Sequence, residues 1–181
     1  MRNIRLSRSN IVAVAAISIA TLLVGTQLPA VAGNDNRTPD VPTTIRPGDT
    51  NKVHFHVYAV GVQIYNWSGS AWVFRAPEAV LFDADGNVVG IHYAGPTWES
   101  ESGSKVVGAR IASASSPNPQ SIPLLLLGAV TTEGPGIFER TTFIQRVNTV
   151  GGVAPSVSGS TIGEEARVPY TAEYFFYRDA Q

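Results

Sequence analysis

Apolar and polar residues alternate in short runs along most of the chain after residue 52. Such alternation is typical of strands that bury one face. No stretch has the spacing of an amphipathic helix of three turns. Because tight turns join neighbouring runs, we expect an all-β, mostly antiparallel, single-domain fold, either a β-sandwich or a small β-barrel with long loops. The predicted strands cover residues 53–67, 71–75, 79–82, 88–93, 98–101, 105–111, 122–130, 138–147 and 168–177.

Two local features modify this pattern. Pro77 has no amide hydrogen and cannot sit in a central strand, so it should separate residues 71–75 from 79–82. Residues 124–127 are four consecutive leucines. A run of this kind suits a strand buried on both faces or a single helical turn, and the surrounding strands favour a strand.

The alternation within residues 53–67 changes phase after Ala59. A slip of one residue would turn every later side chain to the opposite face. A β-bulge near Ala59 would restore the phase. It would also gather the polar side chains of this strand on one face, namely His54, His56, Gln63 and Tyr65.

Residues 1–32 have the order of a secretory signal peptide: three arginines, an apolar run at 11–24, and small residues before Ala32. The alternative is a retained membrane anchor. The apolar run is shorter than the about 20 residues that a spanning helix needs, so we expect cleavage after Ala32 and no stable membrane insertion afterwards. We therefore expect a secreted or cell-envelope-associated protein with an extended segment at 33–51 and a single β domain at 52–181.

Composition excludes some classes of function. The 149 residues that remain after cleavage carry 10 basic and 14 acidic side chains, mixed along the chain. This balance offers no basic footprint for a nucleic acid, so we expect no nucleic-acid partner. The chain has no cysteine, which excludes thiol catalysis and cysteine-ligated metal. We expect no cofactor.

Reactive side chains are most concentrated in residues 89–107. A β-barrel can bind a ligand at its mouth, and aromatic rings there can stack on a sugar or another flat molecule. The alternative is that Trp98 is core and that the polar groups face solvent. The residues predicted to bind a small molecule, glycan or cell-wall component are Gln63, Tyr65, His92, Tyr93, Trp98 and Glu99.

Three weaker patterns suggest other chemistry. His92 and Glu99 could serve as the base and acid of a hydrolase. His54, His56 and His92 could form a three-histidine zinc site, although two histidines on an edge strand are more often solvent-facing. Asp83 to Asn87 could present oxygens to Ca²⁺, but an Asp-Gly pair between apolar runs favours a hairpin turn.

Seven phrases follow one another over nearly the whole mature chain, at residues 61–65, 92–99, 103–106, 122–126, 144–149, 151–155 and 168–174. In this fixed order they resemble the domain-of-unknown-function family 3455 (DUF3455). The resemblance implies an exported single-domain protein and no particular activity. Relatives often carry cysteine at two places that here hold Trp67 and residues 157–160, so the resemblance implies a disulfide that this chain has lost.

Three functions remain open from the sequence. The first is a non-enzymatic exported domain that binds a small molecule, a glycan or a cell-envelope component, or has a structural role there. The second is a secreted hydrolase or metal-assisted enzyme that uses His92 and Glu99. The third is a surface module that binds another protein.

Overall fold

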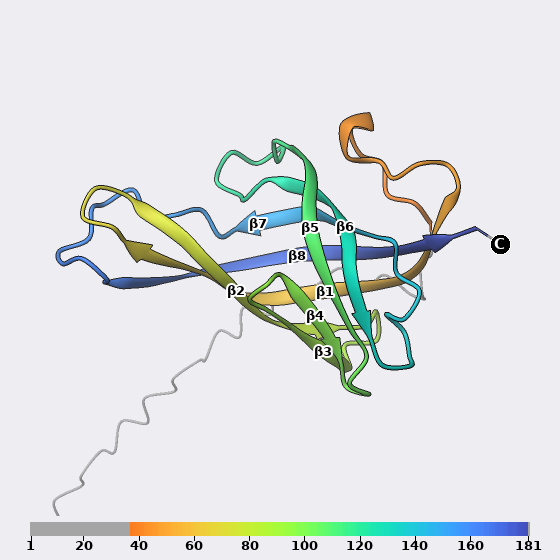
Figure 1. The fold of residues 1–181 in the computed structure, drawn as a ribbon. Coiled ribbons are helices and arrows are strands. Elements are labelled where there is room, and N and C mark those ends of the chain that lie inside the picture. The colour runs from red at the N-terminus through yellow and green to blue at the C-terminus, as the bar shows by residue number, and fades with distance from the viewer. Residues whose placement is uncertain (1–36, 181) are drawn as a thin grey trace, which may run out of the picture. The chain divides into compact units, whose positions relative to one another are not determined.

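The computed structural model of the protein describes residues 37–180. The predicted signal peptide and the first residues of the 33–51 segment lie outside the described residues. The described part is one antiparallel sheet that closes into a barrel in the order β1 to β8, with β8 paired to β1 (Figure 1). The all-β expectation is confirmed, and the fold is a barrel rather than a sandwich. The elements are a 3-10 helix η1 (Thr43–Ile45), β1 (Asn51–Trp67), β2 (Trp72–Phe82), β3 (Val88–Tyr93), β4 (Thr97–Ser100), β5 (Lys105–Ala114), β6 (Leu124–Glu133), β7 (Phe143–Gly151) and β8 (Glu165–Asp179).

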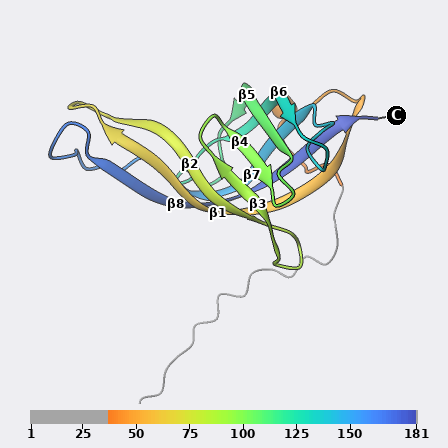
Figure 2. The same ribbon diagram turned by 60° about the horizontal axis from the view of Figure 1, so that its bottom comes forward.

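The strands differ in length. Figures 1 and 2 show β1, β2 and β8 running beyond the barrel on one side, where the β1–β2 turn and the β7–β8 connection lie together. The amide of Trp67 donates to the carbonyl of Glu164, which joins these two connections. Within residues 37–180 the structure contains no helix of the length and hydropathy needed to cross a membrane.

The prediction of a β-bulge near Ala59 was wrong. β1 pairs without interruption with β2 from Tyr58 to Ile64 and with β8 from Phe55 to Asn66. The inward face of β1 therefore continues through Ala59 and Gly61, while Val60 points outward and is 49% exposed. A Cβ at Gly61 would lie 2.1 Å from the Glu78 carbonyl oxygen, so the interior here has room only for the smallest residues. Small residues inside and valines outside produce the apparent phase change.

Aromatic side chains fill much of the barrel interior. Phe138, from the β6–β7 connection, packs on Phe55 and Phe176 at ring-centroid distances of 5.8 Å and 4.7 Å. Phe176 in turn meets the edge of Trp98 at 5.9 Å. Phe138 was predicted as part of a strand, but β7 begins only at Phe143. Its place in the core closes the interior beneath Trp98.

A second apolar layer lies outside β6, β7 and β8. Val41 and Ile45 pack there, so the 33–51 segment is not simply extended: part of it docks on the barrel. Gln145 fixes this contact by donating from Nε2 to the Ile45 carbonyl at 2.6 Å. Because η1 covers the outside, the leucine run is buried on both faces, as the strand interpretation requires. The outer layer comprises Val41, Ile45, Val53, Leu124, Leu126, Val147, Phe175 and Tyr177.

Pro77 does not interrupt β2, contrary to the prediction. It pairs with Gln63 of β1 in a continuous strand. β3 pairs with β2 only from Ala79 onward, so the other edge of β2 is open at Pro77. A proline is tolerated at such an edge because its missing N–H leaves no ladder bond unmade.

The places of the two missing cysteines are in contact. Trp67 covers Gly159, where an added Cβ would lie 2.6 Å from Trp67 Cγ and 2.8 Å from its Cβ. Trp67 also packs on Trp72 at a centroid distance of 5.4 Å. An aromatic contact therefore joins the β1–β2 and β7–β8 connections where the resemblance implies a disulfide.

Replacing Gly159 with alanine should weaken this contact. The methyl group would overlap the rigid base of the Trp67 side chain, and such overpacking typically lowers the free energy of unfolding by about 1–3 kcal/mol. Gly48→Ala is the matched control, because nothing lies within 4 Å of its added Cβ. Urea unfolding would measure both variants, and equal midpoints for the two would contradict the packing described here.

Candidate functional site

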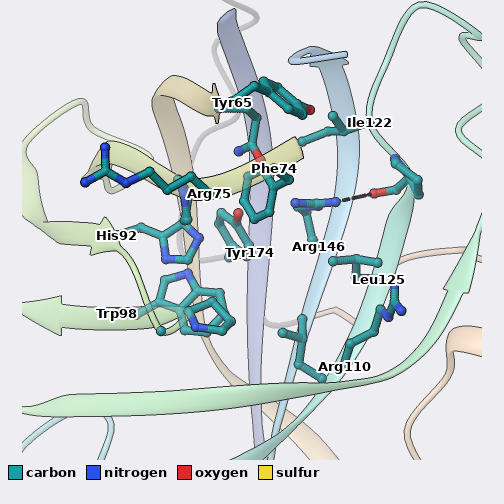
Figure 3. A pocket seen from close by; sticks show the side chains of 16 residues that line it. Tyr65, Phe74, Arg75, His92, Trp98, Arg110, Ile122, Leu125, Arg146 and Tyr174 are labelled. Atoms are coloured by element: carbon teal, nitrogen blue, oxygen red, sulfur yellow. Dashed lines mark hydrogen bonds between the residues drawn. The ribbon is translucent and has the colours of Figure 1, made fainter. Parts of the chain in front are cut away.

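A pocket of about 530 Å³ lies inside the barrel (Figure 3). Each of the eight strands contributes at least one side chain to its wall. The closed sheet brings these residues together, because inward positions of strands far apart in sequence face a common interior. The lining residues are Gln63, Tyr65, Phe74, Arg75, Pro77, His92, Gly95, Pro96, Trp98, Arg110, Ile122, Pro123, Leu125, Leu127, Arg146 and Tyr174.

His92 and Trp98 form one wall of the pocket. They are register partners on β3 and β4, and their rings stack at 4.3 Å with an interplanar angle of 10°. The Nδ1 of His92 donates to the Thr97 carbonyl at 2.8 Å, so this nitrogen carries the hydrogen. Burial lowers the pKa of His92 to about 3, although this hydrogen bond opposes the shift. At neutral pH the ring is therefore uncharged.

Arg146 contributes a buried positive charge. Its side chain comes from β7 and donates from Nε and Nη2 to the Pro123 carbonyl at 3.2 Å and 2.8 Å (Figure 3). The residue is only 9% exposed. Across residues 37–180, no salt bridge joins Arg146 to a carboxylate. Buried charges are normally paired, so an unpaired guanidinium beside a cavity requires an explanation.

The rest of the lining adds positive charge and no negative charge. Arg75 is exposed and pairs with Glu165 at 2.9 Å. Arg110 is also exposed and has no ion pair within the described part of the chain. No aspartate or glutamate from residues 37–180 is among the lining residues. The pocket thus has three arginines in apolar and aromatic walls.

Two buried donors in the lining have no acceptor. These are the amide nitrogen of Gln63 and the indole nitrogen of Trp98, in side chains that are 2% and 1% exposed. Burial raises the pKa of Tyr170, and the nearby Tyr174 hydroxyl raises it further. The side-chain amide of Gln63 lies close enough to Tyr170 to oppose this rise, although its nitrogen forms no hydrogen bond of normal geometry. Unpartnered buried donors are rare in folded proteins and often mark a place for water or a ligand.

The hydroxyl group of Tyr65 already has a hydrogen-bond partner. Its hydroxyl donates to the Gly152 carbonyl at 2.7 Å, and its ring meets Phe74 edge-on at 5.7 Å. Its role in the pocket is therefore to provide an apolar ring surface. Four of the six residues predicted to bind a ligand lie together in the lining: Gln63, Tyr65, His92 and Trp98.

Tyr93 and Glu99 lie outside the barrel, which contradicts their predicted place in the pocket. Strand residues alternate between faces, so the neighbours of His92 and Trp98 must point outward. The Tyr93 hydroxyl donates to Glu99 Oε2 at 2.8 Å, and Lys105 Nζ lies 3.6 Å from the same oxygen. Glu99 is the register partner of Ile91, on the opposite face from His92. The predicted acid–base pair of His92 and Glu99 is therefore not formed.

The three histidines do not converge on a metal site. His54 Nε2 lies 3.3 Å from Thr141 Oγ1. His56 pairs with Glu173 at 2.9 Å and stacks on Phe175, in the outer layer, at 3.9 Å. His92 is inside the barrel, and residues 37–180 contain no group of three or more His, Asp or Glu side chains that could hold an ion. The register of β1 and β8 shifts between Val53 and Phe55, so the irregularity of β1 against β8 lies at His54 rather than near Ala59.

The segment between β2 and β3 is a hairpin turn. Asp83 accepts hydrogen bonds from the backbone amides of Asp85 and Asn87 and from the Asn87 side chain, at 2.8–3.0 Å. These bonds, the Asn87 side chain first, lower the pKa of Asp83. Gly86 adopts a φ of 83°, which the turn requires. The carboxylate of Asp83 therefore stabilises the turn through these hydrogen bonds.

Exposed apolar side chains form a row across the outer face of β1, β2 and β3. Val60 pairs with Val80, and Val80 pairs with Ile91. These three residues are 49%, 37% and 47% exposed. This row is the surface that the protein-interaction hypothesis would use.

Comparison with known proteins identifies a family, but no individual curated protein or solved structure. Neither a search of curated proteins nor a search of solved structures found a significant match. The sequence model of one family, described as a protein of unknown function (DUF3455), matches residues 47–178. The match begins just before β1 and ends in β8, so it covers the whole barrel. The chain therefore belongs to the DUF3455 family.

Proposed function

We propose that this protein is an exported, non-enzymatic protein that binds a small molecule inside its barrel. The observation that carries the proposal is the pocket, with one wall residue or more from every strand and two buried donors without acceptors. Its volume of about 530 Å³ falls within the range of small-molecule sites, which are mostly apolar with a few placed polar groups. Export rests on the signal-peptide pattern of residues 1–32.

A small molecule fits the pocket better than a glycan does. Sugars are usually held by stacking on an accessible aromatic face, but Trp98 is 1% exposed and His92 covers one side of its ring. Tyr174 meets the same indole edge-on at 5.3 Å. Trp98 therefore offers a ligand an edge and an N–H rather than a stacking platform.

Binding also fits better than catalysis. The buried His92 donates its Nδ1 hydrogen to a backbone carbonyl, and in the described part of the chain no carboxylate lines the pocket to act with it. General acid–base catalysis needs such a partner within hydrogen-bond reach of the reacting group. The pocket instead offers fixed donors, a positive charge and apolar surface, which are the features of a binding site.

Filling the pocket should weaken the binding of a neutral apolar probe. N-phenyl-1-naphthylamine should become fluorescent with the wild-type protein, and Leu125→Trp should weaken its binding by about tenfold or more, because the indole would occupy part of the cavity. Val130→Trp is the matched control, since Val130 lies on the same strand and is 62% exposed. Equal affinities for the two variants would refute the proposal.

A further inference from the structure

We infer that the natural ligand is an organic carboxylate, whose carboxyl group pairs with Arg146 and whose apolar body lies against the aromatic wall of the pocket. This inference rests on the proposed binding function and adds the chemical class of the ligand. The observation behind it is a buried guanidinium that faces a cavity and has no carboxylate partner in the described part of the chain.

The hydrogen bonds of Arg146 leave donors available. A guanidinium carries five N–H groups; the Pro123 carbonyl uses one from Nε and one from Nη2, and the guanidinium also lies close to the Tyr174 hydroxyl, which leaves two or more donors for a ligand. That contact holds the side chain in place without neutralising its charge. The planar fork of arginine matches the two oxygens of a carboxylate, and such charge-assisted bonds are about twice as strong as neutral ones.

The charge of Arg146 reaches the whole pocket. Burial raises the pKa of Tyr174 and of Tyr65, and in both cases the Arg146 charge opposes the rise. Burial lowers the pKa of His92, and the Arg146 charge acts in the same direction. These three groups belong to β8, β1 and β3, so the single charge of Arg146 on β7 acts across the cavity.

The remaining lining groups indicate a singly charged, largely apolar molecule. His92 is uncharged and Arg75 is neutralised by Glu165, so Arg146 is the unpaired cation in the interior of the described barrel, with Arg110 exposed at the pocket wall. A doubly charged phosphate would lack a second buried partner. The unpartnered N–H groups of Gln63 and Trp98 are further donors for carboxylate oxygens. Phe74, Leu125 and other apolar side chains would contact the rest of the molecule.

A matched pair of probes tests the inference on the wild-type protein. Isothermal titration calorimetry at pH 7 would compare 2-naphthoate with its neutral methyl ester. We expect the acid to bind about tenfold to a hundredfold more tightly, the range that a charge-assisted hydrogen bond supplies. Arg146→Met should remove this preference, so that the acid and the ester bind with similar affinities, while Arg140→Gln, a change at an exposed arginine outside the pocket, should preserve the preference.

The outcomes separate the two proposals. Tighter binding of the ester, or an acid preference that survives in Arg146→Met, would overturn the carboxylate inference and leave the binding function standing. Displacement of 2-naphthoate by inorganic phosphate at comparable concentration would also overturn it. Failure of both naphthyl probes and of N-phenyl-1-naphthylamine would refute the binding function itself. If circular dichroism shows that Arg146→Met does not fold, the wild-type acid-to-ester ratio and the Arg146→Lys variant decide, since lysine keeps the charge and loses the fork.

Discussion

Replacing Trp98 with alanine should lower the free energy of unfolding by about 3–5 kcal/mol, the usual range for removing a large buried aromatic side chain. Trp98 is 1% exposed and contacts His92, Tyr174 and Phe176. Its loss would leave a void in the centre of the barrel, between the pocket and the aromatic core below it. Urea unfolding followed by far-ultraviolet circular dichroism measures the change.

Trp72→Ala is the control for this prediction. Trp72 is partly exposed, packs on Trp67 in the long β1–β2 hairpin and donates from Nε1 to the Val157 carbonyl at 2.8 Å. Because it lies outside the barrel interior, its removal should cost clearly less stability. Losses of equal size in the two variants would contradict a core centred on Trp98.

Most strands could be predicted because the local alternation of apolar and polar residues indicates which segments are extended. Residues 124–127 show both the strength and the limit of this reasoning. A continuous apolar run indicates a strand buried on both faces, and β6 is such a strand. The segment that covers its outer face, around Val41 and Ile45, lies about 80 residues earlier in the chain and has no pattern that predicts its docking.

The β-bulge near Ala59 was predicted wrongly because the prediction used the hydrophobicity of the side chains and not their size. Val60 and Val62 look like part of a buried face with Ile64, yet only Ile64 of the three is buried, and the narrow interior accepts Ala59 and Gly61 instead of the valines. Where a barrel interior is tight, side-chain size decides which face is inward, and hydrophobicity does not. The sequence contained the small residues but not the distance between the strands that makes them necessary.

Part of the site was predictable by a stricter use of alternation. Because neighbours on a strand face opposite sides, Tyr93 could not share a pocket with His92, nor Glu99 with Trp98. The sequence alone therefore excluded two of the six ligand-binding candidates. Gln63 and Tyr65 were assigned correctly to one face, although the bulge proposed to put the histidines there with them does not exist.

Arg146 was missed because an arginine in a strand usually faces solvent. The sequence did place Arg146 on the same face as Ile144, a fully buried residue, and this was the one available signal. What buries Arg146 is the closure of β7 between β6 and β8, where it pairs with Leu125 and Tyr174. Such long-range pairing is set by the whole sheet.

Acidification should destabilise the protein through His92. The pKa of this ring is about 3 in the folded state and about 6.5 in the unfolded chain, because burial opposes its charge. Above pH 6.5 neither state binds the proton. Between pH 6.5 and 3 the unfolded chain binds it and the folded protein does not, so stability falls as the pH falls.

The expected size of this effect follows from the width of the interval. One pH unit corresponds to about 1.4 kcal/mol, so lowering the pH from 6.5 to 4.5 should cost about 2–3 kcal/mol through His92. Burial raises the pKa of Glu173, but hydrogen bonds from His56 and Asn148 outweigh it and lower the pKa overall. The stability that such carboxylates contribute is therefore lost mainly at lower pH. The interval above pH 4.5 therefore reports mainly on histidine.

Two variants separate the contributions within that interval. His92→Asn retains a side-chain N–H for the Thr97 carbonyl but does not titrate, so its loss of stability between pH 6.5 and 4.5 should be smaller than that of the wild-type protein by about 2–3 kcal/mol. His54→Asn is the comparison: burial, followed by the nearby Arg178 charge, lowers the pKa of this less buried ring only to about 4, so this variant should also reduce the loss of stability, but by less than His92→Asn does. Urea unfolding at the two pH values gives the differences. A His92→Asn protein with the same pH dependence as the wild-type protein would show that the His92 ring takes up its proton without leaving the folded barrel.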